Sequence, residues 1–228
     1  MSTLTLPPTT RRVEYPESNG EPMAETDIHR EEMAALIAML QHYFRDNPDV
    51  YVAGNLFIYY EEGDSTARFA PDVFVVFGVP KHQRRIYRLW DEKYAPAIVF
   101  EVTSRKTWLE DAGNKKTLCA RLRVAEYFLY DPEADYLKPA LQGFRLDNGD
   151  YRSLSSEADG ALFSDVLKLK LYLEDGLLRL VNPATGERLL RPDEALARAA
   201  EEAVARREAE ARIAALEAEL KRLRGNVE

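Results

Sequence analysis

At 228 residues, of which 46% are apolar, the chain is long enough to bury a substantial hydrophobic core in one or two domains. Its single cysteine excludes an internal disulfide framework, and three scattered histidines are too few for a zinc site of the Cys/His type. A bound metal would therefore rest on oxygen ligands, while the net charge of −8 counts against a nucleic-acid partner.

The distribution of this charge weakens that objection. Residues 13–66 contain two basic and twelve acidic residues, whereas residues 67–138 contain thirteen basic and ten acidic residues. The middle of the chain is locally basic, although solvated surface charge is the simpler explanation for any one of these side chains. No run of about 18 apolar residues and no secretory signal is present, so we expect no membrane span and a cytoplasmic location.

The first elements along the chain are an irregular arm and a helix. Residues 1–25 are rich in proline and lack periodicity, which predicts an arm. Thr26 or Asp27 can cap a helix that ends at Asn47-Pro48. The apolar residues between them recur at helical spacing, namely Met33, Leu36, Ile37, Leu40 and Phe44.

Strand-forming segments follow, interrupted by one polar helix. Runs rich in β-branched and aromatic residues predict strands in 50–63, 67–80, 95–104 and 125–132. A helix is expected over 110–122, and short strands around 144–154 and 168–173 should extend the sheet edge. These elements predict a mixed α/β domain over residues 26–191.

From Pro192 to the end at residue 228 the composition changes to Ala, Glu, Arg and Leu, which predicts one long helix. Four apolar residues near its end have heptad spacing, namely Ile213, Leu216, Leu220 and Leu223. This seam covers only about two heptads, so a short coiled-coil homodimer and a solvated single helix are both open.

Two carboxylates stand out because of their strand context. Asp72 follows Pro71 at the start of an apolar strand, and Glu101 lies between Phe100 and Val102 near the end of the next. A buried carboxylate is costly unless it is paired or binds a metal, and adjacent strands could bring the two together. The alternative is that Glu101 simply points outward on an alternating strand.

One helical turn separates Asp111 from Lys115, a spacing that also serves ordinary helix stabilisation. In order along the chain, PDVFVV, VFEVTSRKT, this D-x-x-x-K step and AEYFLYDP resemble the Uma-two family of restriction endonucleases, within the PD-(D/E)xK nuclease superfamily. The resemblance covers roughly residues 15–190. It implies a restriction-endonuclease-like core with a central mixed sheet flanked by helices. The matching positions are Pro71-Asp72, Glu101-Val102, Ser104, Asp111, Lys115, Tyr127 and Asp131-Pro132.

The resemblance also implies roles for these residues. Asp72, Glu101 and the backbone carbonyl of Val102 would hold Mg²⁺ or Mn²⁺, which suit oxygen ligands. The superfamily's usual lysine stands two residues after the glutamate, but Thr103 occupies that position here. The family position for this lysine is Lys115. The remaining candidates are Lys116 as an adjacent substitute, Ser104 and Asp111 in support, and Glu25, Glu31 or Glu32 as an acid from the first helix. For Ser104 the alternative is an ordinary turn residue, and for Asp111 it is an ordinary helix pair with Lys115.

The function implied is hydrolysis of DNA phosphodiester bonds by a metal-dependent endonuclease, with Lys115 orienting water or countering negative charge. A catalytically inactive nuclease fold, used as a binding or assembly module, is the main alternative. An acidic scaffold unrelated to nucleic acid would explain the net charge but leaves Glu101 unexplained.

Overall fold

The structure is a computed structural model that describes residues 13–18 and 26–225. The described chain divides into two compact units, with the boundary between Leu189 and Leu190. The first is a mixed α/β unit, and the second contains the helix α5 (Pro192–Gly225). This confirms the expected fold class. Among the described residues, no helix combines the length and the apolar character needed to cross a bilayer.

The secondary structure of the first unit alternates short helices with strands. Its helical segments are α1 (Asp27–Tyr43), α2 (Leu89–Glu92), α3 (Trp108–Glu110), the π-helical turn η1 (Asp111–Lys115) and α4 (Lys116–Arg121). Its strands are β1 (Val50–Ala53), β2 (Ile58–Tyr59), β3 (Arg68–Phe69), β4 (Val73–Phe77), β5 (Tyr87–Arg88), β6 (Ile98–Val102), β7 (Glu126–Tyr130), β8 (Leu141–Asp147), β9 (Asp150–Ser153), β10 (Leu162–Ser164), β11 (Leu169–Glu174) and β12 (Leu177–Val181).

Over the described ranges these strands form a six-stranded mixed sheet, in the order β1-β4-β6-β7-β8-β9, and two smaller sheets. Only β6 and β7 run parallel within the large sheet, and its other neighbouring strands are antiparallel. The parallel pair requires a crossover, which α3, η1 and α4 provide. The smaller sheets are β10-β11-β12 and β3-β2-β5.

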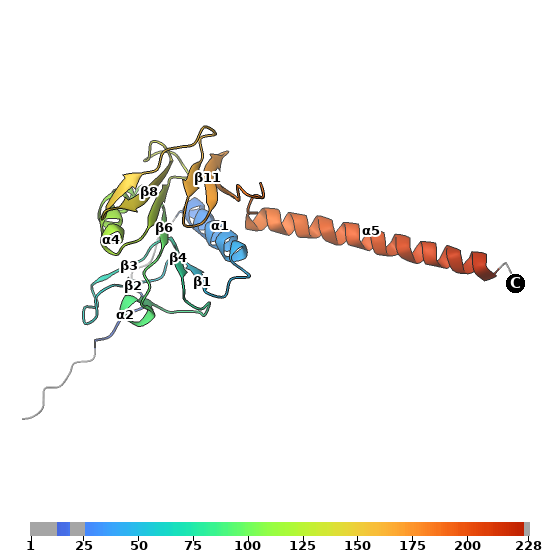
Figure 1. Cartoon of the computed structure of the whole chain (residues 1–228), viewed down its shortest axis with the longest axis horizontal. Helices are drawn as coiled ribbons and strands as arrows, with labels where there is room; N and C mark the ends of the chain where they lie inside the picture. Colours follow the sequence, from blue (N-terminus) through green and yellow to red (C-terminus); the bar gives the residue numbers. More distant parts are fainter. Residues whose placement is uncertain (1–12, 19–25, 226–228) are drawn as a thin grey trace, which may run out of the picture. The chain divides into compact units, whose positions relative to one another are not determined.

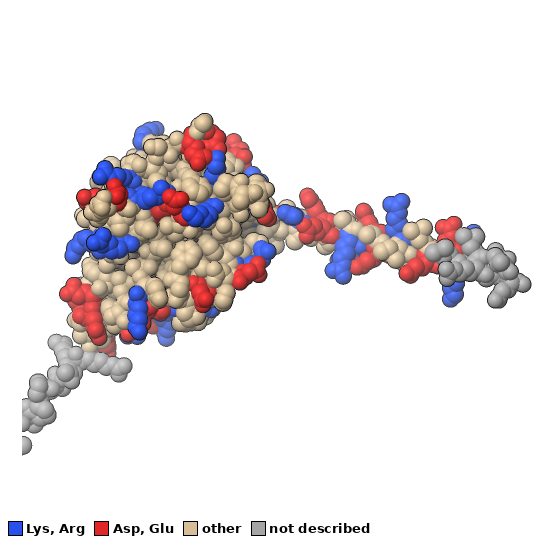
Figure 2. Space-filling model, viewed as in Figure 1, with Lys and Arg blue, Asp and Glu red and all other residues tan. Residues whose placement is uncertain are grey.

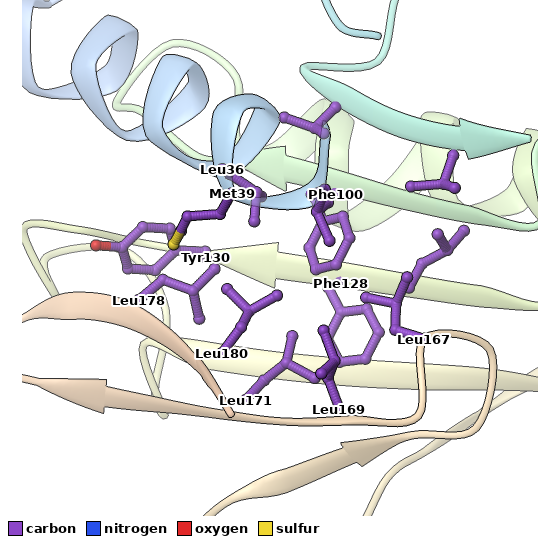
Figure 3. Close-up of a cluster of buried hydrophobic side chains, with 14 of the residues drawn as sticks. Leu36, Met39, Phe100, Phe128, Tyr130, Leu167, Leu169, Leu171, Leu178 and Leu180 are labelled. Carbon is purple, nitrogen blue, oxygen red and sulfur yellow. The ribbon is translucent and has the colours of Figure 1, made fainter. Parts of the chain in front are cut away.

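One hydrophobic core lies between the large sheet and a layer made of α1 and the sheet β10-β11-β12, which cover the same face (Figures 1 and 3). Figure 3 shows Leu36 and Met39 of α1 directed toward the layer that contains Phe100 and Phe128. These two aromatic rings stack at 5.1 Å between centroids. The small sheet supplies leucines to this core, among them Leu169, Leu171, Leu178 and Leu180.

A second core covers the opposite face, where the helical crossover and the sheet β3-β2-β5 pack. Phe74, Val99 and Tyr127 point to this side, together with Cys119 of α4. Because both faces are covered, every residue of β6 and β7 is buried. Glu101 is on the same face as Val99, two residues earlier, so it points toward the helical crossover.

Two expected strands are each broken in the structure. Segment 50–63 forms β1 and β2, and segment 67–80 forms β3 and β4, with each pair divided between two sheets. The break in the first segment is at Gly54, where an added Cβ would lie 2.0 Å from the carbonyl oxygen of Asp72. The expected helix over 110–122 begins earlier, at Trp108, and ends at Arg121.

The helix α5 spans Pro192–Gly225, in agreement with the expected long helix. Figure 2 shows acidic and basic side chains interspersed along it. Arg198 pairs with Glu202 at 2.9 Å, one turn away, and Ile213 and Leu216 are exposed within this unit. The side chains of Leu220 and Leu223 lie outside the described residues, so the heptad seam stays a prediction.

Candidate active site

Sheet register brings the two predicted carboxylates together. Strands β4 and β6 are antiparallel, with Val73 opposite Phe100. Continuing this register by one residue places Asp72 opposite Glu101, at the end of the sheet where β6 finishes. The strand order that the sequence could not supply therefore explains why these two acids meet.

The backbone around Asp72 is held by the segment that follows β1. The Asn55 N–H donates to the carbonyl of Pro71 at 2.9 Å, and Asn55 itself has a positive φ of 51°. Gly54 packs so closely on Asp72 that no other residue fits there. The segment after β1 therefore holds Asp72 from one side, while the neighbouring strand β6 lies on its other side.

Backbone hydrogen bonds connect the two carboxylates to each other's strands. The Val102 N–H donates to Asp72 Oδ2 at 2.8 Å, and the Asp72 N–H donates to Glu101 Oε2 at 3.3 Å. The Asp72 side chain is partly open, with 15% exposed, whereas that of Glu101 is fully buried. One carboxylate can therefore face a substrate, while the other is covered by protein atoms.

Lys115 reaches the site from the π-helical turn. Its Nζ lies 3.0 Å from Glu101 Oε2 and 3.0 Å from Asp111 Oδ1. The Tyr127 hydroxyl of β7 donates to the Asp111 carbonyl at 2.8 Å, which fixes this turn against the sheet. π-helical turns occur often at functional sites, because they redirect side chains within a helix.

The charges in this cluster shift the pKa values of its members. Burial raises the pKa of Glu101, and Asp72 and Asp111 raise it further, while Lys115 opposes the increase. Burial likewise raises the pKa of Asp111, again against the effect of Lys115. For Lys115, burial alone would lower the pKa, but the surrounding carboxylates outweigh it and raise the pKa. The ammonium group thus keeps its proton.

His29 is a residue of the site that the sequence reasoning missed. It lies in the first turn of α1, where its N–H donates to the capping Thr26 hydroxyl at 3.3 Å. Its Nε2 lies 3.2 Å from Asp72 Oδ2, and its side chain is buried. The sequence contains a signal for this position. Thr26 caps the helix, and His29, three residues later, is the first helical position that turns toward the sheet.

The acids proposed on the first helix differ in position. Glu32 is buried, and the Tyr130 hydroxyl donates to its Oε2 at 3.2 Å. Glu31 is exposed, and Glu25 lies outside the described residues. Among the three, the structure therefore gives an inward position to Glu32, one helical turn from His29.

Other residues singled out in the sequence make their contacts away from the carboxylate cluster. The Ser104 hydroxyl lies 3.2 Å from Thr107 Oγ1, in a turn, rather than on a carboxylate of the site. The Lys116 ammonium lies over the ring of Phe144, 4.1 Å from its centroid. Thr103, where the resemblance would place a lysine, is buried, and its N–H donates to the Tyr130 carbonyl at 2.7 Å.

Asp131, in the last of the matching motifs, makes hydrogen bonds to the loop that follows β7. Its Oδ2 accepts the N–H groups of Tyr136 at 2.6 Å and of Leu137 at 2.9 Å. This carboxylate therefore fixes the loop that leaves β7. It takes no part in the cluster around Glu101.

The donor chemistry of the cluster fits a hard divalent cation. Glu101 Oε1 is buried and has no hydrogen-bond partner in the described part of the chain, so this oxygen is available to coordinate a cation. The described residues include no group of three or more His, Cys, Asp or Glu side chains arranged to hold a metal. A metal would therefore rest on Asp72 and Glu101, completed by backbone or water oxygens, which suits Mg²⁺.

Comparisons with known proteins agree with this arrangement at the level of family and fold. Residues 2–180 match the model of the Uma2 family, described as "putative restriction endonuclease". A crystal structure from Anabaena variabilis ATCC 29413, titled as a putative nuclease belonging to DUF820, superposes with a TM-score of 0.50 and 15% identity. The match covers 70% of this chain and 87% of that one. No curated protein matches the chain.

Proposed function

The chain belongs to the Uma2 family of restriction endonuclease-like proteins, and on that premise we propose that it is a metal-dependent endonuclease that hydrolyses DNA phosphodiester bonds. The observation that carries the proposal is the 3.0 Å contact between the Lys115 ammonium and Glu101, a carboxylate of the fully buried strand β6. Asp72 lies opposite Glu101, directly before the neighbouring strand β4. Such a cluster is costly to bury, and catalysis or metal binding gives a reason for it.

We assign the metal ligands to Asp72, Glu101 and the backbone carbonyl of Val102. When bound, Mg²⁺ or Mn²⁺ supplies positive charge that makes a water molecule more acidic and offsets negative charge on the phosphate. The chain's own contribution is to hold these oxygens in place. The Val102 N–H orients Asp72 from one side and His29 orients it from the other.

Lys115 acts as the cationic group of the proposed mechanism. Its ammonium keeps its proton because carboxylates surround it, so its role is to orient the attacking water or counter the developing charge on the phosphate. Asp111 positions Lys115 through their ion pair. A lysine from the helical crossover thus replaces the strand lysine whose position Thr103 occupies.

The test is a nicking assay on supercoiled plasmid DNA with Mg²⁺ or Mn²⁺, combined with calorimetric titration of Mn²⁺. Asp72→Asn and Glu101→Gln should lose both Mn²⁺ binding and cleavage. Lys115→Met should bind Mn²⁺ but cleave at least about 100-fold more slowly. Glu110→Gln, an exposed acid of the same crossover, is the control and should behave as the wild type.

Cleavage that survives Asp72→Asn or Glu101→Gln would contradict the proposed site. The second candidate function is a catalytically inactive nuclease fold that binds or assembles partners, and Thr103 in place of the usual lysine is the observation that favours it. DNA binding by the wild type without cleavage in either metal would support this second function.

A further inference from the structure

Most cationic side chains of the first unit already have a carboxylate partner. Arg84 pairs with Glu92 at 2.6 Å, and Arg145 pairs with Glu126 at 2.9 Å. Within the described part of this unit, five exposed cationic side chains have no ion pair, hydrogen bond or ring contact. They are Lys93, Arg105, Lys106, Arg121 and Arg123.

Four of these five belong to residues 105–123, the segment that also supplies Asp111 and Lys115 to the candidate site. An exposed cation without a counter-ion keeps its full attraction for an anionic partner. In a chain of net charge −8, this segment is the part best suited to attract a polyanion.

Arg105 and Lys106 lie in the turn that joins β6 to the helical crossover. The Ser104 N–H donates to Thr107 Oγ1 at 3.1 Å, and the Thr107 and Trp108 N–H groups each donate to the Ser104 carbonyl at 3.1 Å. The turn is therefore held in one conformation. It begins three residues after Glu101, at the end of the sheet where Asp72 and Glu101 meet.

Arg121 and Arg123 lie at the other end of the crossover. The N–H groups of Ala125 and Glu126, which follow them, both donate to the Ala97 carbonyl just before β6 begins. The crossover thus separates two pairs of unpartnered cations: one that follows the end of β6, which carries Glu101, and one that lies where β6 starts. The second pair is a natural control for the first.

We propose that the turn Ser104–Thr107 is a phosphate clamp, in which Arg105 and Lys106 bind phosphate groups of the DNA duplex beside the bond to be cleaved. The inference rests on the proposed function, because it names how that site holds its substrate. The Arg105 guanidinium can bind two phosphate oxygens at once, and the Lys106 ammonium acts as a compact point charge. These contacts fix the duplex in position without reading its sequence.

A second basic surface is less suited to this role. A hollow of about 850 Å³ beside β1 is lined by Lys81, Arg84 and Arg85. Arg84 already pairs with Glu92, and Arg85 pairs with Glu17 at 2.5 Å. Lys81 donates to the backbone carbonyl of Arg45 at 3.1 Å. The charges around this hollow are already engaged, whereas those of the turn are free to bind phosphate.

The salt dependence of DNA binding tests the clamp. The full chain is titrated with a fluorescein-labelled DNA duplex in EDTA, so that no cleavage occurs, at sodium chloride concentrations from about 50 to 200 mM. For Arg105→Ala/Lys106→Ala, we expect the slope of log Kd against log salt to fall by about 1.8, since each phosphate contact contributes about 0.9. Kd should increase at least about tenfold.

Arg121→Ala/Arg123→Ala is the matched control, because it removes the same number of exposed, unpartnered cations from the other end of the crossover. Its slope should equal that of the wild type. An unchanged slope in Arg105→Ala/Lys106→Ala, equal losses in both double variants, or no binding by the wild type would overturn the clamp. Circular dichroism verifies that each variant is folded.

The binding assay separates this inference from the proposed function. If the turn variant loses slope but the wild type never cleaves DNA with Mg²⁺ or Mn²⁺, the clamp stands and the catalytic proposal fails. If the wild type cleaves DNA and the turn variant keeps both its slope and its kcat/KM, the clamp fails and the catalytic proposal stands.

Discussion

Replacing Lys115 with methionine removes the only cation that contacts the buried carboxylates Glu101 and Asp111 among the described residues. Both carboxylate side chains are fully buried, while that of Lys115 is 15% exposed. Removing one partner of a buried ion pair costs about 3–5 kcal/mol, because the remaining charge has no compensation. For a chain of this length that corresponds to a decrease in Tm of roughly 6–20 °C.

Urea denaturation followed by circular dichroism, without divalent ions, measures this loss. Lys116→Met is the control, since its ammonium lies over Phe144 and contacts no carboxylate. It should cost about 1 kcal/mol or less. Adding Glu101→Gln to Lys115→Met should restore part of the loss, because the double variant no longer buries an unpaired glutamate charge.

Divalent ions provide a second measurement on the same variant. If Mn²⁺ binds Asp72 and Glu101, it supplies the missing positive charge, and a concentration 100-fold above its Kd adds about 2.7 kcal/mol of stability. Lys115→Met as stable as Lys116→Met, or no recovery with Glu101→Gln, would refute the reasoning that this ammonium neutralises the buried acids.

Three further outcomes follow from the geometry. Gly54→Ala should destabilise the chain by about 3 kcal/mol or more in urea denaturation, because the new Cβ meets the Asp72 carbonyl, whereas Gly113→Ala, with open space around it, should be neutral or slightly stabilising. His29→Ala should weaken Mn²⁺ binding by about 10- to 100-fold in calorimetry while the chain stays folded, and unchanged affinity would remove His29 from the site. If α5 forms a coiled-coil dimer, light scattering should give a dimeric mass for the wild type and a monomeric mass for Ile213→Asp/Leu216→Asp, while a monomeric wild type would contradict the dimer.

The central strands were predictable because both of their faces are buried. β4, β6 and β7 appear in the sequence as continuous apolar runs, and Glu101 was noticed because it interrupts one of them. The direction in which Glu101 points was not predictable, since a strand buried on both faces shows no alternation. The meeting of Asp72 with Glu101 depends on the strand order, which local patterns do not contain.

Short-range turn signals in the sequence account for two other features of the structure. Asp175-Gly176 joins β11 to β12, with φ values of 53° and 81°, and Asp-Gly between strand-like runs is a strong hairpin signal. β12 was nevertheless missed. For Ser104 the sequence left a turn open as the alternative, and its contact with Thr107 three residues later has the geometry of such a turn.

The candidate site takes its residues from buried strands and from a short helical crossover, and these two parts should differ in their dynamics. Asp72 and Glu101 are anchored by the buried strands β4 and β6, so their amides should be among the last to exchange with deuterium. Lys115 lies on a short helical crossover, whose amides we expect to exchange earlier than those of the sheet, through local opening. Such an opening would withdraw the ammonium and expose Asp72 and Glu101 to solvent. Cation binding to these two carboxylates would then be a step separate from the folding of the sheet.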